Sequence, residues 1–242
     1  MTRIVALHGF LGKADDWAKF RLAMHDIAPL VEIQPAEIFV QLKSASLKTM
    51  KDWAKKFNQS QKSSHQERNI LLGYSLGGRL ALQAAMDKPG LWDEVILISA
   101  HPGLVGDENK AIRLKSDKEW AEKFIKLPWE EVVHLWNEQP VFIGGGEPQR
   151  AEADFDRPVL AKTLVNWSLG YQDFAEEELA NLRPKLHWYT GEKDEKYVHL
   201  FQELRNAGFI NDYHVIEGSG HRVIFDQPGK LAEQLARDLS LS

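Results

Sequence analysis

Residues 71–79 read Leu-Leu-Gly-Tyr-Ser-Leu-Gly-Gly-Arg, and this stretch decides the fold. An apolar run ends in a Gly-x-Ser-x-Gly turn from Gly73 to Gly77, and small and apolar residues at helical spacing follow it. Glycines on both sides of Ser75 lack a Cβ, so the backbone can turn sharply and leave the serine hydroxyl exposed. A strand, a sharp turn and a helix in this order are typical of a nucleophilic serine rather than of an ordinary glycine-rich turn.

Short apolar runs alternate with helical patterns along the chain. The runs that we interpret as strands lie at residues 3–7, 69–72, 94–99, 185–190 and 213–216, and residues 31–40 are interpreted as a strand and a loop. The patterns with helical spacing lie at residues 15–28, 47–57, 197–207 and 228–239. This alternation indicates an α/β fold, with a mostly parallel sheet covered by helices on both faces.

One long block interrupts the alternation. Residues 104–182 contain no convincing strand, but they carry amphipathic helical stretches and the tryptophans Trp120, Trp129, Trp136 and Trp167. A block of about eighty residues is too long for an ordinary crossover, because such connections are usually short. The sequence therefore predicts a core made of residues 1–103 and 183–242, with a helical cap at 104–182 inserted into it.

A serine hydroxyl becomes reactive when a neighbouring base takes its proton, and on this kind of fold the chain order is Ser, acid, His. Asp194 follows the run at 185–190, and Glu192 is the alternative acid. His221 follows the next run, after Gly-Ser-Gly. Loops at the carboxyl ends of parallel strands share one crevice. We therefore expect Ser75, Asp194 and His221 to form a catalytic triad.

Charge developing on a substrate oxygen needs two fixed N–H donors. The amide of Leu76, directly after the serine, is one candidate, and the amide of Phe10 in the His-Gly-Phe-Leu-Gly loop after the first run is the other. His101, in His-Pro-Gly after the run at 94–99, either lines the pocket or forms a structural corner. The other histidines show no metal-ligand spacing, and no metal or cofactor is expected.

The composition limits the class of partner. The 242 residues carry a formal net charge of -5, so no overall basic field attracts nucleic acid or an anionic membrane. An anionic small molecule must then be held by a local group of arginines. The chain has no cysteine, which excludes disulfides and a thiol nucleophile and fits a reducing compartment. Without a signal-peptide core or an apolar run of membrane length, we expect a cytoplasmic location.

The serine turn, the His-Gly-Phe loop and the Ser-Asp-His order resemble the α/β-hydrolase superfamily. A narrower resemblance is to the 2-succinyl-6-hydroxy-2,4-cyclohexadiene-1-carboxylate synthases of menaquinone biosynthesis. It rests on the opening at residues 7–12 with Asp16-Trp17, the turn at 73–79, and the stretch at 101–104 followed by Arg113, Ser116-Asp117 and Trp120. Trp136 with Gln-Pro-Val-Phe at 139–142, and Ser-Leu-Gly at 168–170, are also similar.

The narrower resemblance implies a lyase that removes pyruvate from a multiply carboxylated cyclohexene by taking a ring proton. It implies substrate contacts from five side chains, namely Tyr74, Arg79, Arg113, Trp136 and Arg157. Guanidinium groups suit such a substrate, because they bind carboxylates with two parallel hydrogen bonds. One departure is that residues 31–40 lack the Gly-His-Gly segment common in this family, so we expect the loop beside the Phe10 amide to differ.

Two other readings stay open. The same triad could serve a small-molecule carboxylesterase or thioesterase, in which Ser75 forms an acyl-enzyme. A binding module that has kept the fold without the chemistry is the third reading. For either enzyme we expect activity to fall at acidic pH, as His221 takes up a proton.

Overall fold

The computed structural model describes residues 2–39, 48–61, 68–173, 179 and 181–241. Six strands form one sheet in the order β2-β1-β3-β4-β5-β6, and every neighbouring pair is parallel. The strands are β1 (Thr2–Leu7), β2 (Val31–Ala36), β3 (Arg68–Tyr74), β4 (Glu94–Ile98), β5 (Lys185–Gly191) and β6 (His214–Ile216). The predicted α/β fold is confirmed. The parts of the expected elements at residues 40 and 47 lie outside the described residues.

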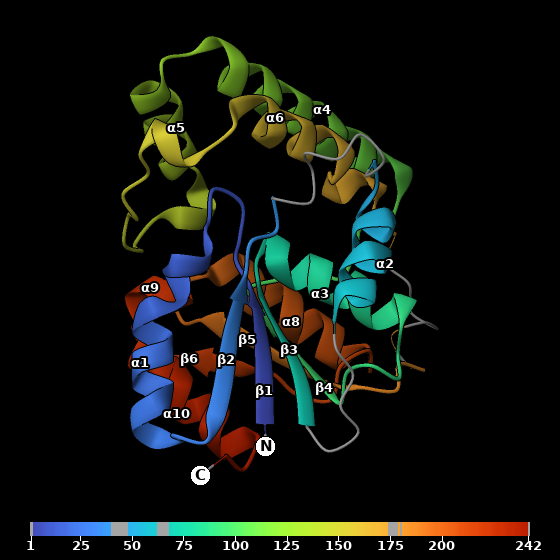
Figure 1. Cartoon of the computed structure of the whole chain (residues 1–242). Coiled ribbons are helices and arrows are strands. Elements are labelled where there is room, and N and C mark those ends of the chain that lie inside the picture. Colours follow the sequence, from blue (N-terminus) through green and yellow to red (C-terminus); the bar gives the residue numbers. More distant parts are fainter. Residues whose placement is uncertain (1, 40–47, 62–67, 174–178, 180, 242) are drawn as a thin grey trace.

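Two layers of helices cover the sheet (Figure 1). One layer contains α1 (Ala18–Ile27), α9 (Val223–Asp226) and α10 (Pro228–Asp238), and the other contains α2 (Met50–Ser60), α3 (Leu76–Asp87) and α8 (Glu195–Asn206). Side chains alternate along each strand, so Ile70 and Leu72 of β3 face the first layer whereas Leu71 faces the second. Because both faces are covered, β3 and β4 are buried along almost their whole length.

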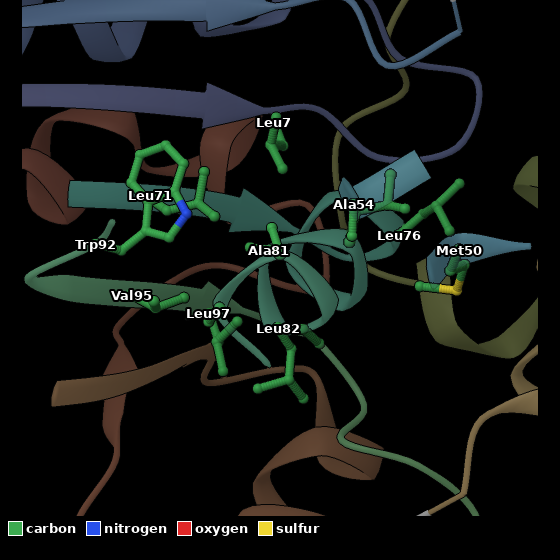
Figure 2. Close-up of a cluster of buried hydrophobic side chains, with 14 of the residues drawn as sticks. Leu7, Met50, Ala54, Leu71, Leu76, Ala81, Leu82, Trp92, Val95 and Leu97 are labelled. Carbon is green, nitrogen blue, oxygen red and sulfur yellow. The ribbon is translucent and has the colours of Figure 1, made fainter. Parts of the chain in front are cut away.

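The larger core cluster packs α3 against the sheet, as Figure 2 shows. Ala81 lies against the strands, together with Leu71 of β3 and Val95 and Leu97 of β4. Small residues on this face of α3 let the helix approach the sheet closely, and the approach brings the start of α3 to the ends of β1 and β3. The residue that precedes the helix, Ser75, is thereby placed at the carboxyl edge of the sheet.

Helix boundaries follow local capping. The helix predicted from residue 47 begins at Met50, because the Thr49 side chain accepts a hydrogen bond from the Asp52 amide and caps the first turn. The helix predicted at 15–28 is divided into a 3-10 turn, η1 (Ala14–Trp17), and α1. Both elements are where the periodicity indicated, and only their ends differ.

The chain between β4 and β5 runs through α4 (Asp107–Lys126), α5 (Trp129–Asn137) and α6 (Arg157–Asn166). Two 3-10 turns, η3 (Pro140–Phe142) and η4 (Glu152–Asp154), lie between α5 and α6, and a third, η5 (Leu169–Tyr171), follows α6. The three helices lie beyond the carboxyl ends of the strands (Figure 1). They share a small apolar cluster centred on Phe124, Val132 and Leu160, which also takes in Leu11 of the loop after β1. The division into core and cap at residues 104 and 182 stays a prediction.

Candidate active site

The serine turn has the strained geometry that its sequence indicates. Ser75 has φ 52° and ψ −113°, and such a positive φ is rare for a residue with a side chain. Only glycine fits at the two flanking positions of the motif. A Cβ on Gly73 would lie 2.3 Å from the Gly77 carbonyl oxygen, and one on Gly77 would lie 2.3 Å from that of Leu7. The turn therefore holds the Ser75 side chain above the ends of β1 and β3.

The three residues predicted as a triad lie together. His221 Nε2 is 3.2 Å from Ser75 Oγ, and His221 Nδ1 is 2.7 Å from Asp194 Oδ2. The Asp194 and His221 side chains are almost fully buried, with exposures of 1% and 3%. Glu192, the alternative acid, instead accepts a hydrogen bond from the Gly218 amide. This arrangement can move a proton from Ser75 to an imidazole oriented by a carboxylate, and the catalytic roles themselves stay a prediction.

The loop after β1 lies directly beside Ser75. A Cβ on Gly9 would come within 2.9 Å of the Tyr74 ring and 3.5 Å of Ser75 Cβ, so the close approach requires glycine. Leu76 is the first residue of α3, and its amide therefore has no acceptor within the helix. The backbone hydrogen bonds among turns and loops of the described chain do not use the Phe10 amide. Both candidate oxyanion donors are thus free to bind a ligand oxygen.

Residues 37–39 support this loop through His8. The buried His8 ring accepts a hydrogen bond from the Ile38 amide at Nε2, 3.2 Å away, and its Nδ1 lies 2.9 Å from the Gly9 carbonyl oxygen. The Trp53 indole donates to the Ile38 carbonyl at 3.1 Å. The backbone of residues 37–39 is therefore joined to the loop after β1 by a hydrogen bond to His8. This contact exists although residues 31–40 lack a Gly-His-Gly segment.

A cavity of about 600 Å³ opens above Ser75, between the sheet and helices α4 to α6. Trp136 of α5 forms part of its wall and packs on Phe10, with ring centroids 4.7 Å apart, and on Trp120 at 5.0 Å. Ser75, Leu76 and His221 lie at its base. Its polar lining includes Arg79, His101, Asn109, Arg113, Ser116, Asp117, Gln139, Thr163 and Lys196.

The cavity carries an excess of positive charge. Arg79 of α3 is buried, and it donates to two neutral acceptors, Gln172 Oε1 at 2.8 Å and the Trp167 carbonyl at 2.7 Å. Burial lowers the pKa of Arg79, and the charge of Arg113 acts in the same direction. Arg113 of α4 is paired with Asp117 at 2.8 Å. Burial also lowers the pKa of Lys196, and the charge of Arg113 adds to this effect. Anions should therefore enter the cavity readily.

Arg157 corrects one expectation, because it does not line this cavity. Its Nε donates to the Phe124 carbonyl at 2.6 Å, and its Nη2 donates to the Leu127 carbonyl. Its Nη1 is 3.0 Å from Glu152 Oε1. The guanidinium thus satisfies carbonyl groups at the end of α4, which have no partners within that helix. Arg157 joins α6 to α4 rather than facing the space above Ser75.

Tyr74, the residue before the serine, does not line this main cavity. Its buried ring packs against Gly9, and the centroid of the ring lies 5.6 Å from that of the His221 ring. Tyr74 and Ser75 both line a second, smaller hollow. Burial raises the pKa of Tyr74, so its hydroxyl is neutral. Among the four other residues expected to contact substrate, Arg79, Arg113 and Trp136 line the main cavity and Arg157 does not.

Two residues that support the site were not singled out from the sequence. Gln172 binds Arg79 through Oε1 and donates from Nε2 to the Pro102 carbonyl at 2.9 Å. Arg150 forms a two-pronged ion pair with Asp16, at 2.7 and 2.8 Å, and both side chains are 6% exposed. This ion pair links the segment before α6 to the turn after Phe10. Neither residue lies in a recognisable motif, so only the tertiary contacts identify them.

The described residues contain no group of three His, Asp or Glu side chains that could hold a metal ion. None of the helices in the described ranges has the length and apolar character needed to cross a bilayer.

Known proteins resemble this chain along nearly its whole length. The alpha/beta hydrolase family matches residues 4–234. The 2-succinyl-6-hydroxy-2,4-cyclohexadiene-1-carboxylate synthase of Salmonella agona (strain SL483) is 31% identical over 98% of this chain and 94% of its own. The synthase of Escherichia coli O1:K1 / APEC is 30% identical over 98% of this chain and 93% of its own.

A solved structure shows the same fold. MenH from S. aureus has a TM-score of 0.86 and 19% sequence identity, covering 99% of this chain and 93% of that chain. The likeness extends through both the sheet and the helices that lie between β4 and β5, since nearly the whole chain is matched. The chain therefore belongs to the alpha/beta hydrolase family and, within it, to the family of 2-succinyl-6-hydroxy-2,4-cyclohexadiene-1-carboxylate synthases.

Proposed function

We propose that this protein forms 2-succinyl-6-hydroxy-2,4-cyclohexadiene-1-carboxylate by eliminating pyruvate from a carboxylated cyclohexene that carries it as an enol ether. The observation that carries the proposal is the similarity to the named synthases along 98% of the chain. A cavity with several cations directly above a serine and histidine pair supports it. The substrate class is a small molecule with more than one carboxylate.

In the proposed reaction Ser75 removes the ring proton next to the succinyl ketone, and His221 takes the hydroxyl proton of Ser75. Asp194 keeps the imidazole oriented and stabilises its charged form. The electron pair from the broken C–H bond shifts through the ring alkene and breaks the bond to the leaving oxygen. The imidazolium proton then neutralises the leaving enolate, which becomes pyruvate. The 3.2 Å and 2.7 Å separations within the triad support these transfers.

Charge develops on the ketone oxygen as the ring proton leaves. We assign its stabilisation to the amides of Phe10 and Leu76, because donors fixed before the reaction need no reorganisation during it. Arg79 and Arg113 bind substrate carboxylates, and Trp136 covers the ring. Tyr74 packs against Gly9 in the loop that carries Phe10 and borders the smaller hollow beside Ser75, and we assign it a substrate contact there.

Residues 104–182 act in this proposal as a cap that shields the reaction from water. The contacts of α4 with α6, and the shared cluster around Phe124, support a unit with some packing of its own. We place the reaction in the cytoplasm, where a chain without cysteine needs no oxidising environment.

Ester or thioester hydrolysis is the second candidate, because the same triad geometry serves acyl transfer. The test supplies the cyclohexene intermediate to the purified protein and measures pyruvate and the absorbance of the diene. Ser75→Ala is the matched control for residual background. Folded wild-type protein that releases no pyruvate, but hydrolyses neutral esters, would establish the second candidate instead.

A substitution of Arg113 separates the elimination reaction from ester hydrolysis. Arg113→Ala should weaken turnover of the carboxylated substrate and leave hydrolysis of a neutral ester unchanged, since only the first contains an anion for Arg113 to bind. Equal losses on both substrates would contradict the role given to Arg113.

A further inference from the structure

The His101-Pro102-Gly103 segment forms a rigid corner between β4 and α4. Gly103 has φ 149°, a conformation that favours glycine, and its amide donates to His101 Nδ1 at 3.2 Å. Gln172 Nε2 donates to the Pro102 carbonyl at 2.9 Å, and the Leu104 amide donates to the Gln172 carbonyl at 2.9 Å. The position and orientation of the His101 ring are therefore held from both sides.

The corner also selects the tautomer of the ring. Nδ1 accepts the Gly103 hydrogen bond, so it carries no proton, and a neutral ring must then carry its proton on Nε2. Burial lowers the pKa of His101 to about 3, and the charges of Lys196, Arg79 and Arg113 act in the same direction. At neutral pH the ring is therefore uncharged, with Nε2–H as its donor.

The remaining donor faces the cavity. His101 lines the same space as Ser75 and His221, and the described residues offer Nε2 no hydrogen-bond partner. The described residues leave Nε2 without a partner, but the atom is not fully buried, so it remains accessible from the open cavity. The ring thus combines a fixed acceptor on the protein side with an unused donor on the cavity side.

We propose that His101 positions a substrate carboxylate by donating a neutral hydrogen bond from Nε2. The cations around it make an anion the preferred occupant of this part of the cavity, and a carboxylate has a second oxygen for Arg113 or Lys196. A neutral donor adds a directional contact without a fourth positive charge. The inference rests on the proposed function, since it assigns one of that substrate's carboxylates a place.

The same contact contributes to specificity. A ligand that places an apolar group at this position leaves the Nε2–H without a partner, and sites built around a hydrogen bond reject such analogues strongly. Loss of a hydrogen bond to a charged group corresponds to a change of about tenfold to hundredfold in affinity. His101 would then distinguish carboxylated from neutral ligands more sharply than the Lys196 ammonium group alone.

Two matched substitutions separate this role from a structural one. His101→Asn keeps an acceptor near the Nδ1 position for the Gly103 amide but has no donor at the Nε2 position. His101→Gln places an amide donor near Nε2 and gives up the Nδ1 acceptor. The probe is 2-succinylbenzoate, an aromatic molecule with a succinyl group and a ring carboxylate, and its Kd is measured by calorimetry or tryptophan fluorescence.

We expect His101→Asn to raise the Kd tenfold or more and His101→Gln to stay within about threefold of wild type. The ring nitrogens of wild-type protein, labelled with 15N, should show the proton on Nε2 from pH 5 to 8, and the probe should shift that signal. An Asn variant that binds as well as wild type, or a proton found on Nδ1, overturns the inference.

The outcome for His101 is distinguishable from that for the reaction. Pyruvate release by wild-type protein is measured in parallel, and its absence ends the proposed function. A tenfold difference in probe Kd between the Asn and Gln variants still supports the His101 contact in that case. Normal turnover with equal KM in both variants ends the His101 inference and leaves the reaction intact.

Discussion

Replacing Gln172 by leucine tests the polar network beneath the cavity. The Gln172 side chain is buried, accepts from Arg79 Nε at 2.8 Å and donates to the Pro102 carbonyl at 2.9 Å. Leucine fills a similar volume but satisfies neither group. A guanidinium N–H and a carbonyl would both remain without a partner in a buried place.

The expected cost follows from these two groups. A hydrogen bond to a charged group contributes about 1.5–3 kcal/mol, and a buried carbonyl without a partner costs about 1–3 kcal/mol. The apolar surface of a buried leucine offsets part of this loss. We therefore expect the free energy of unfolding to fall by about 2–4 kcal/mol, a large share of the 5–15 kcal/mol typical of a folded domain.

The assay is urea unfolding followed by far-UV circular dichroism, with binding of 2-succinylbenzoate measured on the folded variant. Gln202→Leu is the matched control, because Gln202 is exposed on α8 and should change stability by no more than about 0.5 kcal/mol. Probe affinity should fall in Gln172→Leu, since Arg79 and the His101 corner both lose their support. A Gln172→Leu variant as stable as the control would refute the claim that this amide satisfies two buried groups.

Three further predictions concern charge and protonation. Asp194→Asn should lower kcat by about 10³–10⁴-fold with little effect on KM, because the amide favours the wrong His221 tautomer. An Asn variant that keeps the kcat of the wild type would contradict this. Arg157→Ala should lower the free energy of unfolding by about 1–3 kcal/mol through loss of its bonds to the Phe124 and Leu127 carbonyls, and should leave KM within about twofold. Burial lowers the pKa of His101 from 6.5 to about 3, so between these pH values the imidazole of the unfolded chain is protonated and that of the folded chain is not. The free energy of unfolding is therefore unaffected by this group above about pH 6.5 and decreases as pH falls toward 3. Urea unfolding at several pH values should show a weaker dependence over that range in His101→Gln, and equal slopes would disprove the neutral ring.

Much of the architecture could be read from the sequence because it depends on local pattern. The apolar runs at β3 and β4 are covered on both faces, and such strands are recognisable without knowledge of their neighbours. The Gly-x-Ser-x-Gly turn requires its glycines for steric reasons that act within a few residues, as the 2.3 Å approach at Gly73 demonstrates. Helix ends were predicted less well, because the Thr49 cap outweighs the periodicity that precedes Met50.

The polar environment of the site depends on residues far apart in the chain. Arg157 has the expected residue type, but the carbonyls at the end of α4 bind its guanidinium, and no pattern around residue 157 signals this. His101 had two readings from the sequence, a corner and a wall of the pocket, and the structure shows both in one ring. Gln172 joins Arg79 to that corner across 93 and 70 positions of the chain.

The amino-acid sequence by itself determined the fold, the serine turn and the order of the residues expected to act, because steric limits and apolar periodicity operate locally. Only the tertiary structure decided which cations border the cavity, which are used in holding helices together, and which nitrogen of His101 carries a proton. These properties arise from burial and from hydrogen bonds between distant segments, and they exist only when the helices after β4 have packed over the ends of the strands.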